Sequence, residues 1–166
     1  MSASDKAAVR AAVDATSKDL LNYLVRRVPS AEDAADLYGQ TMLIAWEKIT
    51  KFPREPERQR MWLFVIAANT LSNHRRSSQR RLVLADRLRE VVAATEMSPP
   101  VEGAYAVRDA VLRLHEAQRE LVMLIHWDGF NIVEAAEILG LNPSTARSRY
   151  AAARQTLRKA LIDART

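Results

Sequence analysis

Hydrophobic side chains recur three and four residues apart along most of the chain, which is the spacing of an amphipathic α-helix. The helical segments form two groups, and Ser98-Pro99-Pro100 interrupts the pattern between them. The first group comprises residues 6–27, 31–51 and 57–80, and the second comprises 106–115, 116–127, 132–139 and 143–163. The pattern predicts an all-α protein with domains at 1–82 and 103–166, joined by a flexible linker at 83–102.

Helix starts are marked by capping residues. Ser4 or Asp5 is expected to cap the first helix, and Ser30 the second, with Asp33 in the capping-box position. Two prolines place a loop at Phe52–Glu57. In the second domain Asn131 is expected to cap one helix. The next helix has the clearest start in the chain, with Asn142 as N-cap and Pro143 at the first helical position.

The segment 31–51 carries an unusually wide apolar stripe. Its predicted core face consists of Ala34, Leu37, Tyr38, Thr41, Ile44 and Ala45. Met42, Leu43 and Trp46 widen the stripe, and burial is the favoured interpretation for Trp46. The alternative is a docking role for the polar side of the same helix, at Asp33, Asp36, Gln40 and Glu47. In the second domain the predicted inward positions are Val107, Ala110, Val111, Leu114, Leu121, Leu124 and Ile125.

The net charge of +5 is unevenly distributed. Residues 58–81 hold six arginines and no acid, and residues 143–166 hold six basic residues and one acid. The segments before each of these blocks are acidic. Two basic blocks on separate helices predict that a polyanion contacts the protein at two places.

Catalysis and membrane insertion are not expected from the composition. Cysteine is absent, the three histidines are scattered, and no Gly-rich phosphate loop occurs, so we expect no metal, no cofactor and no enzyme activity. The longest apolar run, Met61–Ala68, is too short to span a bilayer. The N-terminus lacks a signal-peptide core, and no further domain is expected after Thr166. A cytoplasmic protein is predicted.

Residues 132–154 have the pattern of a helix-turn-helix. Ala136 is small where two helices must cross, Gly140 lies in the turn, and Ala146, Tyr150 and Ala153 point inward on the second helix. Such a helix can enter the major groove of DNA with its first turn nearest the bases. The predicted DNA-binding residues are Ser144, Thr145, Arg147, Ser148, Arg149 and Arg154. Arg147 is expected to read a guanine, and Thr145 to bind a phosphate.

The segment 58–81 combines aromatic residues, amides and arginines, which favours unpaired or distorted nucleic acid as its ligand. Together with a duplex-reading module, this arrangement is typical of transcription initiation. In several segments the chain resembles the extracytoplasmic-function sigma factors of bacterial RNA polymerase. AEDAADLYGQTMLIAWEKI is similar to their region 2.1–2.2. MWLFVIAANTLSNHRR resembles the WL-x-x-IA-x-N-x-x-x-D-x-x-R motif of regions 2.3–2.4, and residues 114–161 resemble region 4.

The resemblance implies partners and site residues. It implies binding to core polymerase, through the coiled coil of the largest subunit and the flap of the second-largest subunit, to promoter DNA and to an anti-sigma factor. The polymerase-binding residues would be Asp33, Asp36, Leu37, Gln40 and Thr41. The downstream (minus-ten) element would be melted and read by Arg54, Arg58, Arg60, Asn69, Asn73, Arg75, Arg76 and Arg80. The Lys51–Arg60 loop would hold an extruded base, and the second helix of the helix-turn-helix would read the upstream (minus-thirty-five) element.

Two positions depart from the family pattern. Ala68 stands where a basic residue is common, and Asn73 stands where an acid is common. These departures bear on promoter preference and on strand melting. Two other functions remain open at this stage: a dimeric helix-turn-helix regulator that binds an inverted repeat without polymerase, and a helical adaptor without salt-dependent DNA affinity.

Overall fold

The computed structural model of the chain describes residues 3–89 and 104–163. Regular structure within these ranges is helical throughout, which confirms the all-α prediction. The chain divides into two compact units, Met1–Val92 and Ala93–Thr166. Each unit has a hydrophobic core of its own.

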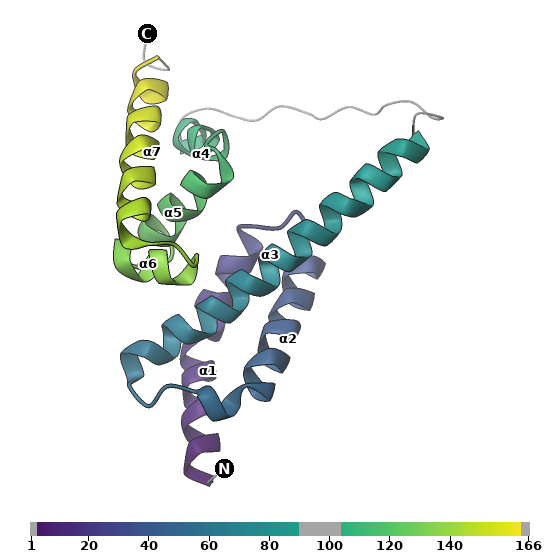
Figure 1. Cartoon of the computed structure of the whole chain (residues 1–166), viewed down its shortest axis with the longest axis vertical. Coiled ribbons are helices and arrows are strands. Elements are labelled where there is room, and N and C mark those ends of the chain that lie inside the picture. The colour runs from purple at the N-terminus through teal and green to yellow at the C-terminus, as the bar shows by residue number, and fades with distance from the viewer. Residues whose placement is uncertain (1–2, 90–103, 164–166) are drawn as a thin grey trace. The chain divides into compact units, whose positions relative to one another are not determined.

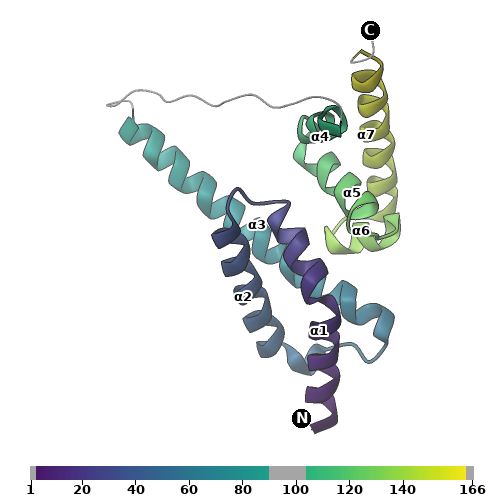
Figure 2. The same cartoon turned by 180° about the vertical axis from the view of Figure 1, so that it is seen from behind.

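The first unit is a bundle of three helices, α1 (Ala3–Val25), α2 (Ala31–Glu47) and α3 (Pro56–Arg89), as Figures 1 and 2 show. Each helix contacts the other two, and a 3₁₀ turn at Ile49–Lys51 follows α2. The rings of Tyr23 and Phe64 meet edge to face at 5.2 Å and join α1 to α3. The largest fully buried side chains of the bundle are Leu20, Tyr23, Leu24, Leu37, Thr41, Leu63 and Phe64.

In the first unit, the helix start predicted at Ser30 agrees with the structure, and those of α1 and α3 differ. The Ser30 hydroxyl accepts the backbone N–H of Asp33 at 2.9 Å, so Ser30 caps α2 as predicted. Helix α1 begins at Ala3, so Ser4 and Asp5 lie inside its first turn and neither is the N-cap. Pro56 takes the first position of α3, where its missing N–H costs no hydrogen bond, and the predicted loop therefore ends at Glu55.

Helix α3 is longer than predicted. Its 34 residues span about 51 Å at 1.5 Å per residue, against 17 residues in α2, so it projects beyond the bundle (Figure 1). It continues nine residues past Arg80 because LVLADRLR contains neither glycine nor proline. Residues 83–89 of the predicted linker are therefore helical, and residues 90–102 lie outside the described ranges.

The second unit contains α4 (Ala104–Leu112), α5 (Glu116–His126), α6 (Ile132–Ile138) and α7 (Pro143–Asp163), and α7 contacts the other three. Its core joins Val111, Leu114, Val122, Met123 and Ala153. The two turns place Gly129 at φ 75° and Gly140 at φ 64°, the left-handed region that favours glycine. Val107 is 45% exposed, and its predicted burial is wrong because α4 buries only the side that bears Ala110 and Val111.

Candidate nucleic-acid and protein interfaces

The start of α7 is fixed by residues next to it in sequence. The Asn142 side-chain oxygen accepts the backbone N–H of Ser144 at 3.0 Å and the Ser144 hydroxyl at 2.9 Å. Helix α6 starts on a complete capping box, in which Asn131 accepts from Glu134 and the Glu134 carboxylate accepts the Asn131 N–H at 2.8 Å. Both helices of the predicted helix-turn-helix therefore begin at defined residues.

The turn between α6 and α7 is tight because small residues lie at the crossing. Ala136 and Ala146 are completely buried, and the N–H of Leu141 donates to the carbonyl of Ala136 at 2.8 Å. Gly140 supplies the left-handed residue of the turn. The predicted helix-turn-helix geometry is confirmed, since these contacts fix the entry of α7 relative to α6.

The outer face of α7 carries the basic side chains. Arg147, Arg154 and Arg158 are exposed and lie on one side of the helix, with Ala151 between them. Ser144, Ser148 and Arg149 are exposed as well, and Thr145 is half-buried. A shallow groove runs along this face and is lined by Ser148, Ala151, Ala152, Arg154, Gln155 and Arg158. The alanines in the groove leave room for a ligand to approach the helix backbone.

A contact between α5 and α7 supports this face from behind. Nε2 of His126 and the hydroxyl oxygen of Tyr150 lie 2.9 Å apart in a hydrogen bond, and the two rings stack at 6.1 Å. The Arg154 guanidinium lies 6.0 Å from the centre of the Tyr150 ring. Sequence reasoning did not find His126, because nothing in the local pattern links it to a residue 24 positions away.

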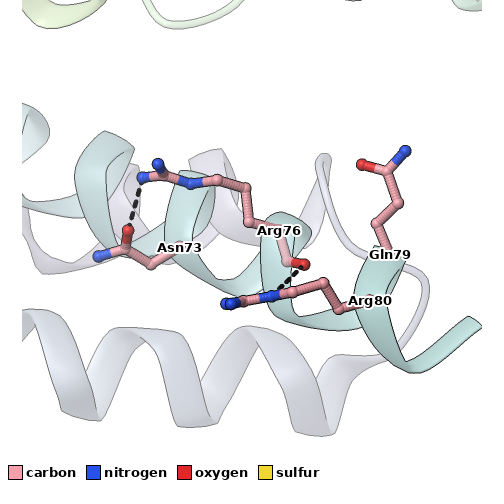
Figure 3. Close-up of a pocket in the computed structure, with 4 residues that line it drawn as sticks. All are labelled: Asn73, Arg76, Gln79 and Arg80. Carbon is pink, nitrogen blue, oxygen red and sulfur yellow. Dashed lines mark hydrogen bonds between the residues drawn. The ribbon is translucent and has the colours of Figure 1, made fainter. Parts of the chain in front are cut away.

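Helix α3 presents a second basic face. Arg58, Asn69, Asn73, Arg76 and Arg80 are exposed and fall within about 40° of one direction around the helix at 100° per residue. Asn73, Arg76 and Arg80, with Gln79, line a surface pocket on this face (Figure 3). The pocket brings together three of the predicted downstream-element residues.

Two of the predicted downstream arginines point elsewhere. Arg60 donates to the carboxylate of Asp19 on α1 at 3.4 Å, and its guanidinium lies over the Phe64 ring at 4.8 Å. Arg75 is half-buried and lies about 100° from Arg76 around the helix. Arg58, Arg76 and Arg80 therefore share one exposed face of α3, and Arg60 and Arg75 are partly buried away from it.

The loop before α3 is shorter than the predicted Lys51–Arg60. Only residues 52–55 lie between the 3₁₀ turn and α3, and Arg54 is exposed there. The side-chain amide of Gln59 donates to the carbonyls of Pro53 at 3.2 Å and Arg54 at 3.5 Å. Phe52 packs edge to face on Trp62 at 5.5 Å, and Trp62 packs on the bundle core. The loop is thus tied to the first turns of α3.

Helix α2 differs most from its prediction. Leu37 and Thr41 are buried, as the apolar pattern predicted, although the family resemblance implied that both contact the polymerase. The Thr41 hydroxyl donates to the Leu37 carbonyl at 2.7 Å. Leu43 and Trp46 are 59% and 56% exposed, so the burial favoured for Trp46 is wrong. The reason is geometric: in a three-helix bundle, Ala34, Leu37, Thr41 and Ala45 already fill the buried stripe of α2.

The exposed side of α2 is a continuous surface, which we call the α2 outer face. It consists of Glu32, Asp36, Gly39, Gln40, Leu43, Trp46 and Glu47. Two large apolar side chains are flanked by polar and acidic ones, the arrangement of a protein–protein interface. The width of the apolar stripe was the signal in the sequence, because one small bundle cannot bury it all. Asp33 is half-buried beside this face.

The described part of the chain holds neither a metal site nor a membrane-spanning helix. Within residues 3–89 and 104–163, no group of three or more His, Asp or Glu side chains is placed to hold a metal ion. None of the helices in these ranges is both long enough and apolar enough to cross a membrane.

Comparison with known proteins agrees with this geometry. Residues 12–81 match the model of sigma-70 region 2, and residues 104–157 match that of sigma-70 region 4. The two matches together cover more than half of the chain, and each falls within one structural unit.

Several RNA polymerase sigma factors are similar to this chain. The ECF RNA polymerase sigma factor BldN of Streptomyces coelicolor is 30% identical over 90% of this chain and 59% of its own length. SigL of Mycobacterium tuberculosis is 29% identical over 96% of this chain and 92% of its own length. The sigma factor RpoE of Bartonella quintana, solved with the anti-sigma factor NepR, shares 25% identity and a TM-score of 0.68 over 94% of this chain and 95% of that chain. With both regions matched in order, the chain belongs to the sigma-70 family, as an RNA polymerase sigma factor of the extracytoplasmic-function type.

Proposed function

We propose that this chain binds core RNA polymerase and directs promoter-specific initiation of transcription. The observation that carries the proposal is that each unit has an exposed arginine-bearing helix face, and the first also exposes the large apolar side chains Leu43 and Trp46. Two separate DNA contacts and a docking surface are what a promoter-reading polymerase subunit needs. The dimeric regulator is not favoured, because both sigma-70 regions are matched.

The polymerase-binding surface is the α2 outer face. Asp36 and Gln40 keep their proposed role, and Leu43 and Trp46 replace the buried Leu37 and Thr41 as the main contacts. Large apolar and aromatic side chains that are exposed in the free protein are the usual energetic centre of such an interface. Gly39 lies in the same face, where the absence of a side chain allows a partner helix to come close.

The DNA-binding residues remain those proposed from the sequence, with their order of importance changed by the structure. For the upstream duplex they are Ser144, Thr145, Arg147, Ser148, Arg149 and Arg154. For the downstream element the exposed Arg54, Arg58, Asn69, Asn73, Arg76 and Arg80 take the main role. Arg60 and Arg75, which are partly buried away from that face, take a lesser one.

Regulation and location follow from the same reasoning. RpoE of Bartonella quintana was solved in complex with the anti-sigma factor NepR, and CnrH in complex with the cytosolic domain of CnrY. CnrH shares 26% identity and a TM-score of 0.64 with this chain. We therefore propose an anti-sigma partner here, a cytoplasmic location beside polymerase and DNA, and action by binding rather than by catalysis.

The deciding experiment is run-off transcription from host genomic fragments by purified chain and core polymerase. Selective transcripts that require the chain are expected. A double variant, Leu43→Ala with Trp46→Ala, should weaken core binding by about 30-fold or more, since interface hot spots contribute about 2 kcal/mol or more. The matched control is Leu21→Ala with Val25→Ala, which removes two exposed apolar side chains from α1 and should change binding less than about twofold.

Two outcomes would contradict the proposal. A chain that binds an inverted repeat as a dimer and never supports transcription with core polymerase would be a regulator of the other kind. Equal losses in the double variant and its control would show that α2 has no special role.

A further inference from the structure

The pocket on α3 is built from two arginines and two amides. Asn73, Arg76, Gln79 and Arg80 line it, and none of the four is acidic. Segment 58–81, which contains them all, has no aspartate or glutamate. Two arginines thus line one concave surface, and none of its described lining residues carries a carboxylate. Such a pocket favours an anion with several acceptor oxygens, and the oxygens of a phosphate suit guanidinium donors well.

Each guanidinium is held in place by the neighbouring turn of the helix. An Nη of Arg76 donates to the Asn73 side-chain oxygen at 2.8 Å. Nε of Arg80 donates to the Arg76 carbonyl at 3.3 Å. Figure 3 shows both side chains running back along the helix, Arg76 to Asn73 and Arg80 to the carbonyl of Arg76. Each bond uses one of the five N–H donors of a guanidinium, which leaves its other donors for a ligand.

The neutral side chain at position 73 decides the charge of the pocket. An aspartate there could also accept from Arg76, but the contact would be an ion pair that offsets the arginine's charge. It would also place a negative charge beside any bound phosphate. Asparagine orients Arg76 with an oxygen of similar position and leaves the full positive charge directed at the ligand. The same amide carries two N–H donors that a carboxylate lacks.

We propose that Asn73 is a positioning residue of a phosphate pocket, formed with Arg76, Gln79 and Arg80, that grips the backbone of an opened promoter strand. The proposal rests on the function proposed above and adds to it a defined site and a reason for asparagine at this position. Two further exposed residues of the α3 face, Arg58 and Asn69, share its direction, so a strand held in the pocket passes along the same face.

The test compares salt dependence in four variants of the full chain. Binding of a fluorescein-labelled single-stranded DNA of mixed sequence is measured by anisotropy over a range of KCl concentrations, and a duplex of the same length is measured in parallel. The logarithm of the binding constant falls with the logarithm of salt by about 0.7 per phosphate contact for a single strand. This slope reports contacts to phosphate, and a merely structural change leaves it unaltered.

We expect Arg76→Ala and Asn73→Asp each to lower the slope by about 0.7, one contact, and to weaken single-strand binding about tenfold in dilute salt. Asn73→Ala keeps the charge of Arg76 and loses only its orientation, so affinity should fall by about twofold to threefold with the slope unchanged. The matched control is Asn22→Asp, the same chemical change at an exposed position of α1, which should leave both quantities as they are.

Several results would overturn the proposed phosphate-binding role of the pocket. These are an Asn73→Asp slope equal to that of the wild type, an equal fall in Asn22→Asp, or wild-type binding without salt dependence. A larger loss for duplex than for single strand would assign the site to closed DNA instead and refute the opened-strand role. Run-off transcription by the wild type is measured alongside. Its absence would refute the sigma-factor proposal, whereas normal transcription with unchanged slopes would refute only the pocket.

Discussion

The basic faces of α7 and α3 are held in position by different means. In α7 the helix itself is fixed: Asn142 caps its start, and the buried Ala136 and Ala146 bring it close to α6. In α3 individual side chains are fixed, since Arg76 is bonded to Asn73 and Arg80 to the Arg76 carbonyl. One face depends on where a helix begins, and the other on where guanidinium groups point.

This difference suits the two forms of DNA that the helices are proposed to bind. A duplex has a groove of fixed width. A rigid helix that enters the groove at a fixed angle therefore brings the same side chains to the same bases each time. An opened strand has no fixed shape, and a protein that binds it must supply the order through fixed contacts of its own. The comparison therefore predicts that changes in packing harm α7 most, and changes in charge harm α3 most.

The largest expected effect comes from crowding the helix crossing behind α7. Ala136→Leu adds a large side chain at a completely buried position and should destabilise the second unit by about 3 kcal/mol, with loss of upstream-duplex binding. Urea unfolding followed by circular dichroism measures it. Ala11→Leu, at an exposed position of α1, is the control and should change stability little. Unimpaired stability and binding in Ala136→Leu would mean that the crossing does not position α7.

The second-largest expected effect is a loss of base preference in the upstream element. Arg147→Ala should cost about 2 kcal/mol at one upstream base pair and relax the preference there, because a bidentate contact to guanine is lost. Binding of the holoenzyme to single-base variants of the upstream element measures this. Arg158→Ala, three turns further along the same face, is expected to weaken all sequences alike through a phosphate contact. If Arg147→Ala behaves as Arg158→Ala does, α7 reads no base through this residue.

The smallest expected effect separates two arginines of α3. Arg60→Ala should reduce stability by at most about 0.5 kcal/mol, since its pair with Asp19 is partly exposed, with 33% and 56% of the two side chains accessible. It should weaken opened-strand binding less than Arg58→Ala does, because Arg60 is directed at α1. The two variants remove the same charge two residues apart, and anisotropy titrations compare them directly. A greater loss of opened-strand binding in Arg60→Ala than in Arg58→Ala would show that Arg60 belongs to the DNA-binding face.

Sequence reasoning succeeded where neighbouring residues decide the structure. The caps at Ser30, Asn131 and Asn142 and the turn at Gly140 follow from local chemistry, and all four are confirmed. It failed at Trp46, because burial depends on how many helices surround α2. It also missed the Arg60–Asp19 pair, whose partners are 41 residues apart.

The sequence by itself determined the all-α fold, the helix-turn-helix and the family, because helix periodicity, caps and motif order are properties of short stretches of chain. The tertiary structure decided which of those residues are available to a partner. A three-helix bundle buries one stripe of α2, so Leu37 and Thr41 lie in the core, as their spacing predicted, whereas Leu43 and Trp46 are exposed to a partner. On α3 the pair with Asp19 of α1 holds Arg60 away from the face that carries Asn73, Arg76 and Arg80.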